Sequence, residues 1–141
     1  MFSTTHFAGW GDMDFNSHMR NTAFLDKSAD VRLRFFRESG FSSEEFHRLR
    51  IGPVIRRDEM EYFKEVRLMG EMRVTLAAAG LADDGSRFKL RNEFWLGEKL
   101  AARVTSEGGW LDLDKRKLVA PPEKLLAALR LLERTPDFTA F

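Results

Sequence analysis

The segment that decides the fold lies near the N-terminus and reads Trp10-Gly11-Asp12-Met13-Asp14-Phe15-Asn16-Ser17-His18-Met19-Arg20-Asn21. Its first half is rich in Gly, Asp, Asn and Ser, which favour turns, so it predicts a loop. Residues 4–10 contain Thr and aromatic side chains and are expected to form a first strand. A helix is expected to follow the loop, which makes the segment a strand–loop–helix unit.

The expected helix runs from about Arg20 to Ser39, because its polar residues fall on one side at helical spacing. Gly40 suits its C-terminal cap. Apolar side chains fill the broad remaining arc, and an arc this wide suggests a helix embraced by a curved surface. Arg32 points into the middle of that arc. An unpaired charge is costly to bury, so we expect a buried partner or a subunit boundary at Arg32.

Strands are predicted after a polar stretch at residues 42–50, which is read as a loop. From there the apolar side chains alternate with polar ones, which is typical of antiparallel strands with one solvated face. The alternation is clearest in three groups of residues: Met60 and Tyr62; Met72, Val74 and Leu76; Phe88, Leu90, Phe94 and Leu96. Asp83-Asp84-Gly85-Ser86 predicts a hairpin, and Gly97-Glu98 predicts a tight turn into a fifth strand.

The C-terminal part is expected to contain one long strand and one short helix. The apolar residues of this strand change from even to odd positions along the chain, from Leu100, Ala102 and Val104 to Leu111 and Leu113. A bulge at Gly108-Gly109 is predicted to cause this change. Pro121-Pro122 opens an amphipathic segment that is expected to form the closing helix. The predicted architecture is α+β: one domain over residues 1–141, with a five-stranded antiparallel sheet around a long central helix and a short C-terminal helix.

Composition excludes several classes of function. The chain has 23 basic and 22 acidic residues and a net charge of +1, which does not suggest a nucleic-acid-binding protein. It has no Cys and only three dispersed His, so neither a thiol nucleophile nor a metal site is expected. No apolar run is long enough to cross a membrane, and no secretory signal is recognised at the N-terminus. The expected compartment is the cytoplasm.

The order of elements, together with residues 10–21, resembles the hotdog-fold thioesterases of the 4-hydroxybenzoyl-CoA thioesterase family. The segment is similar to that family's aromatic-Gly-Asp-x-Asp-x-x-Gly-His-Val-Asn-Asn pattern, and Gly108 to Asp114 resembles its last strand. The resemblance implies a sheet wrapped around a central helix, two subunits that build each site together, and an acyl-CoA substrate without a metal or bound cofactor. The second Asp of the pattern, which acts on the thioester carbonyl, is Asp14 here.

The sequence also departs from the family pattern. Ser17 stands where Gly is usual, Arg20 replaces the first Asn, and Ala29 lies where many members have an acidic residue. Another branch of the family carries Tyr and His at the positions of Trp10 and Asn21, so the roles of those two side chains do not transfer to this chain. The acyl group of the substrate stays open.

The candidate site consists of Asp14, His18 and Asn21. Asp14 is expected either to attack the thioester carbonyl or to activate water. By resemblance, the backbone N–H of Asn21 at the helix start is the donor to the thioester oxygen. His18 either orders the loop or contacts the substrate. The alternative for Asp14 is that it only accepts N–H groups at the helix start, a common role for Asp.

Four further positions are interpreted as structural. Asp12 is expected to accept turn and cap N–H groups, and Tyr62 is expected to pack as a strand aromatic rather than act as a catalytic phenol. Gly85 is expected to need positive φ in its hairpin. Lys115-Arg116-Lys117 is interpreted as a solvated basic turn, the alternative being a contact with coenzyme A phosphates.

Three functions compete for this fold. The leading hypothesis is hydrolysis of an acyl-CoA, or else of an acyl-carrier-protein thioester. A non-catalytic acyl-CoA-binding protein is the alternative, since fold alone does not fix function. A dehydratase or hydratase ranks last because its His pattern is not found. A homodimer or a dimer of dimers is expected, because a five-stranded sheet leaves an edge that a second copy would cover.

Overall fold

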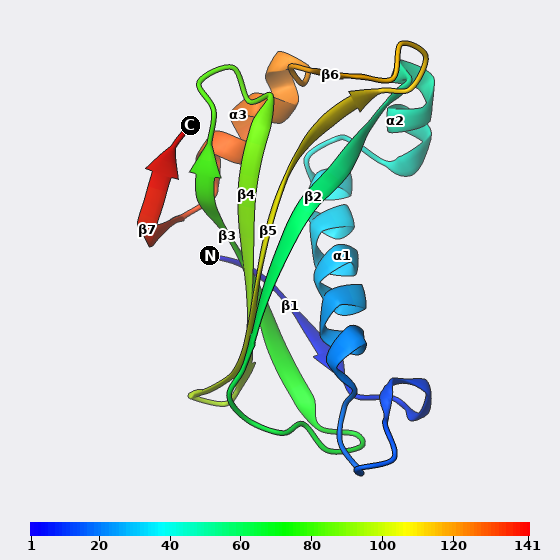
Figure 1. Cartoon of the computed structure of the whole chain (residues 1–141), viewed down its shortest axis with the longest axis vertical. Coiled ribbons are helices and arrows are strands. Elements are labelled where there is room, and N and C mark those ends of the chain that lie inside the picture. The colour runs from blue at the N-terminus through cyan, green and yellow to red at the C-terminus, as the bar shows by residue number, and fades with distance from the viewer.

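The computed structural model describes all 141 residues of the chain. Its elements are β1 (Phe2–Phe7), a 3₁₀ turn (Trp10–Asp12), α1 (Asn21–Glu38), α2 (Ser43–Leu49), β2 (Ile51–Tyr62), β3 (Glu71–Leu81), β4 (Arg87–Leu96), β5 (Lys99–Asp112), β6 (Lys117–Val119), α3 (Glu123–Leu131) and β7 (Arg134–Ala140). The main sheet has the order β1-β3-β4-β5-β2, and α1 lies along one of its faces (Figure 1). No helix is long and apolar enough to cross a membrane.

The predicted strand–helix–meander order is confirmed, and all five expected strands lie in the main sheet. Two short strands extend the sheet to seven, since β6 pairs with β5 and β7 pairs with β3. The pairing of β7 with β3 is parallel and was not expected. Both turns occur as predicted, with Gly85 at φ 75° and Gly97 at φ 60°. Positive φ at these two positions explains why glycine stands there.

The prediction of a loop at residues 42–50 was wrong, because most of that stretch forms α2. The side chain of Ser42 accepts the backbone N–H of Glu45, and two Glu residues in the first turn favour the helix dipole. Phe46 anchors the helix in the core. Strand β2 starts at Ile51, well before the alternating pattern becomes visible in the sequence.

The predicted parity flip in β5 was also wrong. Trp110 is fully buried and continues the even parity of Val104 and Ser106, so the inward face of β5 is unbroken from Ala102 to Trp110. The irregularity lies in the partner strand, where the register shifts between Ile55 and Arg57. A Cβ at Gly108 would overlap the backbone oxygen of Val54, so the glycine lets the bulged strand approach closely.

The core fills the space between α1, α2, α3 and the inward face of the sheet. Phe36 and Phe46 pack against Trp110 with ring centroids 5.5 and 5.9 Å apart. The expectation that a curved surface embraces α1 was only partly right. Leu33 is 53% exposed, because the sheet reaches around one side of the helix and leaves its other flank uncovered.

Candidate active site

The sequence folds residues 8–20 into a compact loop that leads from β1 to α1. Asp12 holds this loop, because its Oδ2 accepts the Gly9 N–H at 2.8 Å and lies 2.9 Å from Nζ of Lys27. Burial raises the pKa of Asp12, but the Lys27 ammonium and the Gly9 N–H outweigh it and bring the pKa below its usual value. The structural interpretation of Asp12 agrees with these contacts.

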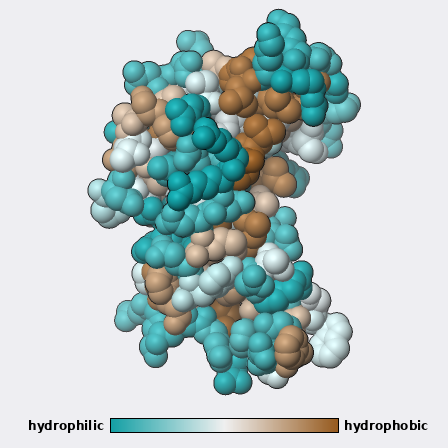
Figure 2. All heavy atoms as spheres, in the orientation of Figure 1, coloured by the Kyte–Doolittle hydropathy of each residue, from teal (hydrophilic) through white to brown (hydrophobic).

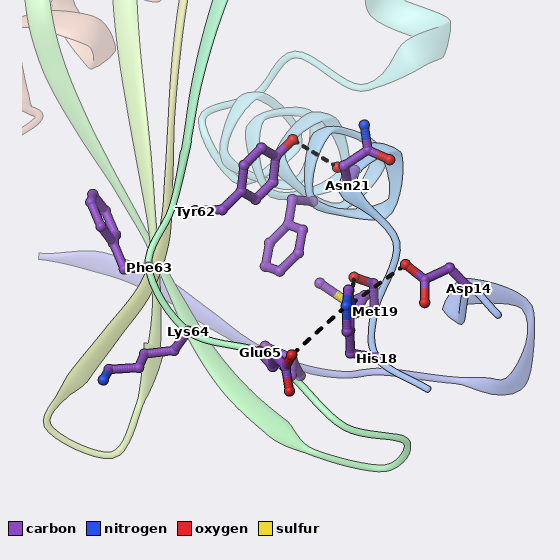
Figure 3. Close-up of a pocket in the computed structure, with 10 residues that line it drawn as sticks. Asp14, His18, Met19, Asn21, Tyr62, Phe63, Lys64 and Glu65 are labelled. Carbon is purple, nitrogen blue, oxygen red and sulfur yellow. Dashed lines mark hydrogen bonds and ion pairs between the residues drawn. The ribbon is translucent and has the colours of Figure 1, made fainter. Parts of the chain in front are cut away.

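Asp14 sits in the next turn of the loop and is only 23% exposed. Its Oδ1 accepts the backbone N–H of Asn16 at 2.8 Å, and its backbone N–H donates to the carbonyl of His18. Ser17 adopts φ 67°, a positive value that favours glycine. It stands where the pattern described above usually has Gly. These bonds fix the Asp14 carboxylate while leaving its Oδ2 directed toward His18 (Figure 3).

His18 lies between two carboxylates. Its Nδ1 is 3.2 Å from the carbonyl of Met19 and 3.5 Å from Oδ2 of Asp14, while its Nε2 is 4.0 Å from Oε1 of Glu65. Figure 3 shows Asp14 and Glu65 on opposite sides of the imidazole. The ring is therefore tied to the loop on one side and faces the connection between β2 and β3 on the other.

Asn21 is the first residue of α1, and its backbone N–H donates to no group of the protein. The helix start therefore presents a free N–H and the positive end of its dipole. The phenol of Tyr62 donates to the Asn21 carbonyl at 3.2 Å and packs edge-on against Phe24. Burial raises the pKa of Tyr62, which keeps this phenol protonated as a donor. The amide of Asn21 points away from Tyr62 (Figure 3).

All three sequence-predicted site residues line one pocket of about 420 Å³. Its remaining walls are largely apolar and come from α1, the end of β2 and the connection to β3: Met19, Phe24, Tyr62, Phe63, Lys64, Glu65 and Val66. A carboxylate, an imidazole and the first residue of a helix thus line one pocket with apolar walls, which is an arrangement suited to acyl transfer. No group of three or more His, Cys, Asp or Glu side chains is arranged to hold a metal ion.

The sequence analysis missed residues 63–66, which supply a wall of the pocket. No motif marks them, and the charged pair Lys64-Glu65 after an alternating strand was the only available signal. Within one chain, the basic turn at residues 115–117 is not part of the pocket. Asp112 pairs with Ile51 whereas Ala102 pairs with Tyr62, so this turn lies at the opposite end of the β2–β5 ladder.

Comparison with solved structures supports the fold. A Staphylococcus aureus protein in complex with CoA is 22% identical and has a TM-score of 0.85, over 92% of this chain and 81% of that one. A 1,4-dihydroxy-2-naphthoyl-CoA thioesterase from Synechocystis is 16% identical (TM-score 0.82, 93% and 96%). A gentisyl-coenzyme A thioesterase is also 16% identical (TM-score 0.80, 90% and 98%). The α+β architecture is therefore the predicted hotdog fold.

The family of this chain follows from a comparison of its sequence with family models. A search of curated proteins finds no match. The model of the thioesterase-like superfamily, however, matches residues 8–129, a range that begins before the Asp14 loop and ends in α3. Since this match covers most of the sequence and includes every residue of the candidate site, the chain belongs to the thioesterase-like superfamily.

Proposed function

We propose that this protein hydrolyses an acyl-CoA thioester to a free acid and coenzyme A, with Asp14 as the reacting carboxylate. The observation that carries the proposal is the meeting of Asp14, His18 and the start of α1 in one pocket. Thioester hydrolysis needs a nucleophile or base and a polarised carbonyl. The leaving thiol is acidic enough to depart as a thiolate, so no strong general acid has to be found in the pocket.

Two routes are open to Asp14. As a nucleophile, it would attack the carbonyl carbon and form a mixed anhydride while the C–S bond breaks and the thiolate leaves; water would then hydrolyse the anhydride. As a general base, it would take a proton from water as that water attacks the same carbon. Both routes are proposed to use Oδ2, which lies 3.5 Å from Nδ1 of His18, since Oδ1 accepts the Asn16 N–H.

The start of α1 is the proposed oxyanion hole. The free N–H of Asn21 would donate to the thioester oxygen as negative charge develops on it, and the positive end of the helix dipole would add to that effect. A donor of this kind is typically worth about 2.7–4 kcal/mol in the transition state. Tyr62 supports the site indirectly by holding the Asn21 carbonyl.

His18 is proposed to order the loop and to donate a hydrogen bond. Its Nδ1 lies near both the Met19 carbonyl and Asp14, which fits a role in positioning the reacting carboxylate. A direct contact between His18 and the substrate is the alternative, because the ring also lines the pocket.

A CoA ester is proposed as substrate because one structural neighbour is a CoA complex and two carry names of CoA thioesterases. Coenzyme A would enter as part of the substrate, and no other cofactor is required. Within the superfamily, the motif at residues 10–21 favours the 4-hydroxybenzoyl-CoA thioesterase family. We also propose that the working form is a homodimer, or a dimer of dimers, because β2 forms a free sheet edge.

The substitution Asp14→Asn tests the proposal. Asn keeps the size and hydrogen-bonding reach of Asp and serves equally well at a helix start, but it can neither attack a carbonyl nor take a proton from water. Released thiol would be measured on a panel of acyl-CoA esters. We expect a folded variant that binds acyl-CoA, with a kcat lower by about two or more orders of magnitude, because an interaction used in the transition state is lost.

Asp12→Asn is the matched control, since Asp12 is a carboxylate two residues away that contacts Lys27 and does not line the pocket. It should retain kcat per folded molecule. Activity of Asp14→Asn within a few-fold of the unmodified protein would remove Asp14 from the mechanism. Tight binding of acyl-CoA by both proteins, with no hydrolysis by either, would favour the acyl-CoA-binding alternative.

A further inference from the structure

The ring of His18 faces hydrogen-bond acceptors at both of its nitrogens. Its Nδ1 lies 3.2 Å from the carbonyl oxygen of Met19 and 3.5 Å from Oδ2 of Asp14. Its Nε2 lies 4.0 Å from Oε1 of Glu65. A carbonyl oxygen and an ionised carboxylate accept hydrogen bonds and do not donate them. Each ring nitrogen is therefore best satisfied when it carries a proton.

The number of N–H groups on the ring decides which of these contacts are favourable. A neutral imidazole has one N–H and one bare nitrogen, so one nitrogen would face an acceptor with no proton between them. An imidazolium has two N–H groups and donates toward Asp14 and toward Glu65 at the same time. The charged side chains that line the pocket with His18 are Asp14, Lys64 and Glu65, and the two carboxylates lie on opposite sides of the ring (Figure 3). This arrangement favours the doubly protonated ring.

A backbone hydrogen bond sets Glu65 beside His18. The N–H of Met19 donates to the carbonyl of Val66 at 2.7 Å, and both of these residues are almost fully buried. His18 immediately precedes Met19, and Glu65 immediately precedes Val66. The bond therefore joins the Asp14 loop to the connection between β2 and β3 directly beside the two side chains. Their proximity follows from the backbone and not from a chance contact of two flexible side chains.

Further backbone bonds fix the rest of that connection. The N–H groups of Phe63 and Lys64 both donate to the carbonyl of Ala101, at 2.7 and 3.0 Å. The N–H of Met69 donates to the carbonyl of Ala8 at 2.7 Å. The connection is thus held by β5 on one side of Glu65 and by the start of the Asp14 loop on the other. Its position relative to His18 is set by the fold.

The carboxylate of Glu65 keeps freedom of movement although its backbone is fixed. Its side chain is 64% exposed, and the 4.0 Å contact has the length of an ion pair rather than of a hydrogen bond. Figure 2 shows hydrophilic and apolar residues side by side at the lower end of the molecule, where Figure 1 places this connection. Contacts in active sites often shorten when substrate binds, and rotation of an exposed carboxylate would close this one.

We propose that Glu65 is a positioning residue, which accepts the Nε2–H of His18 and so keeps the Nδ1–H directed toward Asp14. The inference rests on the function proposed above and assigns the role of His18 within it. The ring then serves as a fixed cation and hydrogen-bond donor beside the reacting carboxylate, and not as a general base. Glu65 does not touch the reacting atoms and acts through His18.

The alternative is a surface ion pair without influence on the site. An ion pair as exposed as this one contributes little to stability, so variants of Glu65 are expected to fold. Unfolding measurements would therefore not separate the two readings. The protonation of the His18 ring and the rate of turnover do separate them, because only a positioning residue affects both.

Nitrogen NMR of the imidazole rings tests the contact without any measurement of activity. The chain has three His, so the signals of His18 are identified by their loss in His18→Asn. Near neutral pH, both ring nitrogens of His18 should give signals of protonated nitrogen in the unmodified protein. In Glu65→Gln, which keeps the reach of the side chain and removes its charge, the Nε2 signal should move toward that of a bare nitrogen.

A bare Nε2 in the unmodified protein, or the same Nε2 signal in both proteins, would overturn the proposal. Glu71→Gln is the matched control, since Glu71 is an exposed carboxylate at the start of β3 that does not line the pocket. It should leave the His18 signals unchanged. Because no turnover enters this measurement, a protein that hydrolyses no thioester would refute the proposed function without deciding the role of Glu65.

Turnover tests the consequence for the site. Glu65→Gln should lower kcat by about fivefold with little change in KM, because it disturbs the group that positions Asp14 and not the binding of substrate. Glu65→Asp keeps the charge and should restore much of the lost kcat. Glu71→Gln should retain the kcat of the unmodified protein.

A double-mutant cycle distinguishes action through His18 from a direct contact between Glu65 and the substrate. In a protein that already carries His18→Asn, Glu65→Gln should have no further effect on kcat. A loss that adds fully to that of His18→Asn, or a change in KM alone, would overturn the proposal and make Glu65 a substrate contact. Equal kcat values for Glu65→Gln and the unmodified protein would overturn it as well.

Discussion

Large aromatic side chains occur near both ends of the sheet, but they are buried at one end and exposed at the other. At the hairpin end, Trp110 is fully buried and its Nε1–H donates to the carbonyl of Gly85 at 3.0 Å. At the pocket end, Trp10 is 86% exposed and Phe15 is 96% exposed. The hairpin end is closed by α3 and by the packing around Trp110, whereas the loop at the pocket end is held by polar bonds. Stability is therefore expected to concentrate at one end and chemistry at the other.

The largest expected difference comes from truncating one tryptophan at each end. Trp110→Ala should reduce the free energy of unfolding by about 3–5 kcal/mol, because it leaves a cavity among Phe36, Phe46 and Phe88. Trp10→Ala should change it by about 0.5 kcal/mol or less. Urea unfolding of both variants measures the two losses in free energy of unfolding. Similar losses would contradict the expectation that stability is concentrated at the hairpin end.

A smaller difference should separate the two turn glycines, which lie at opposite ends of β4. Both have positive φ, so Gly85→Ala and Gly97→Ala share a backbone cost of about 1–2 kcal/mol. At Gly85 the new Cβ would also lie 2.7 Å from Cδ1 of Leu126 and 3.0 Å from Cγ of Pro121, whereas nothing lies within 4 Å at Gly97. Thermal unfolding should show a further loss of about 1–3 kcal/mol for Gly85→Ala alone. Equal losses would mean that α3 does not close tightly over the hairpin.

The smallest expected effect concerns Asp12 at the pocket end. Its folded pKa lies below the unfolded value of about 3.9, so its contribution to stability is present above that value and is lost as the pH falls through the folded pKa. Asp12→Asn should therefore cost about 1 kcal/mol or less at pH 7. The difference from the unmodified protein should shrink as the pH falls below the unfolded pKa. A difference that grows toward acid pH would contradict the Lys27 pairing.

Local signals in the sequence predicted the elements well where the pattern was regular. The helical spacing of residues 20–39 and the alternation in β3 and β4 correspond to observed elements, and both glycine turns occur at the expected positions. The same reasoning failed where a strand was irregular. Toward the end of β5, the apolar pattern predicts that the odd-numbered Leu111 and Leu113 face inward. The residue that is buried there is Trp110.

The site was only partly visible in the sequence. Asp14, His18 and Asn21 could be named because they lie within eight residues in a recognisable pattern. The wall formed by Phe63, Glu65 and Val66 could not be named, since it reaches the pocket through the pairing of distant strands. A buried partner or a subunit boundary was expected at Arg32, but the identity of one partner as Asn92, 60 residues away, required the fold.

The sequence by itself determined the periodicities, the turn glycines and the loop with its two aspartates, because each depends on neighbours within a few residues. The tertiary structure decided which aspartate faces a pocket and which holds the loop: Asp12 meets Lys27 from α1, while Asp14 meets His18 and the apolar wall after β2. It also decided that Arg32 is buried with one nitrogen unpaired. Such facts depend on contacts between residues far apart in the chain, and no local pattern encodes them.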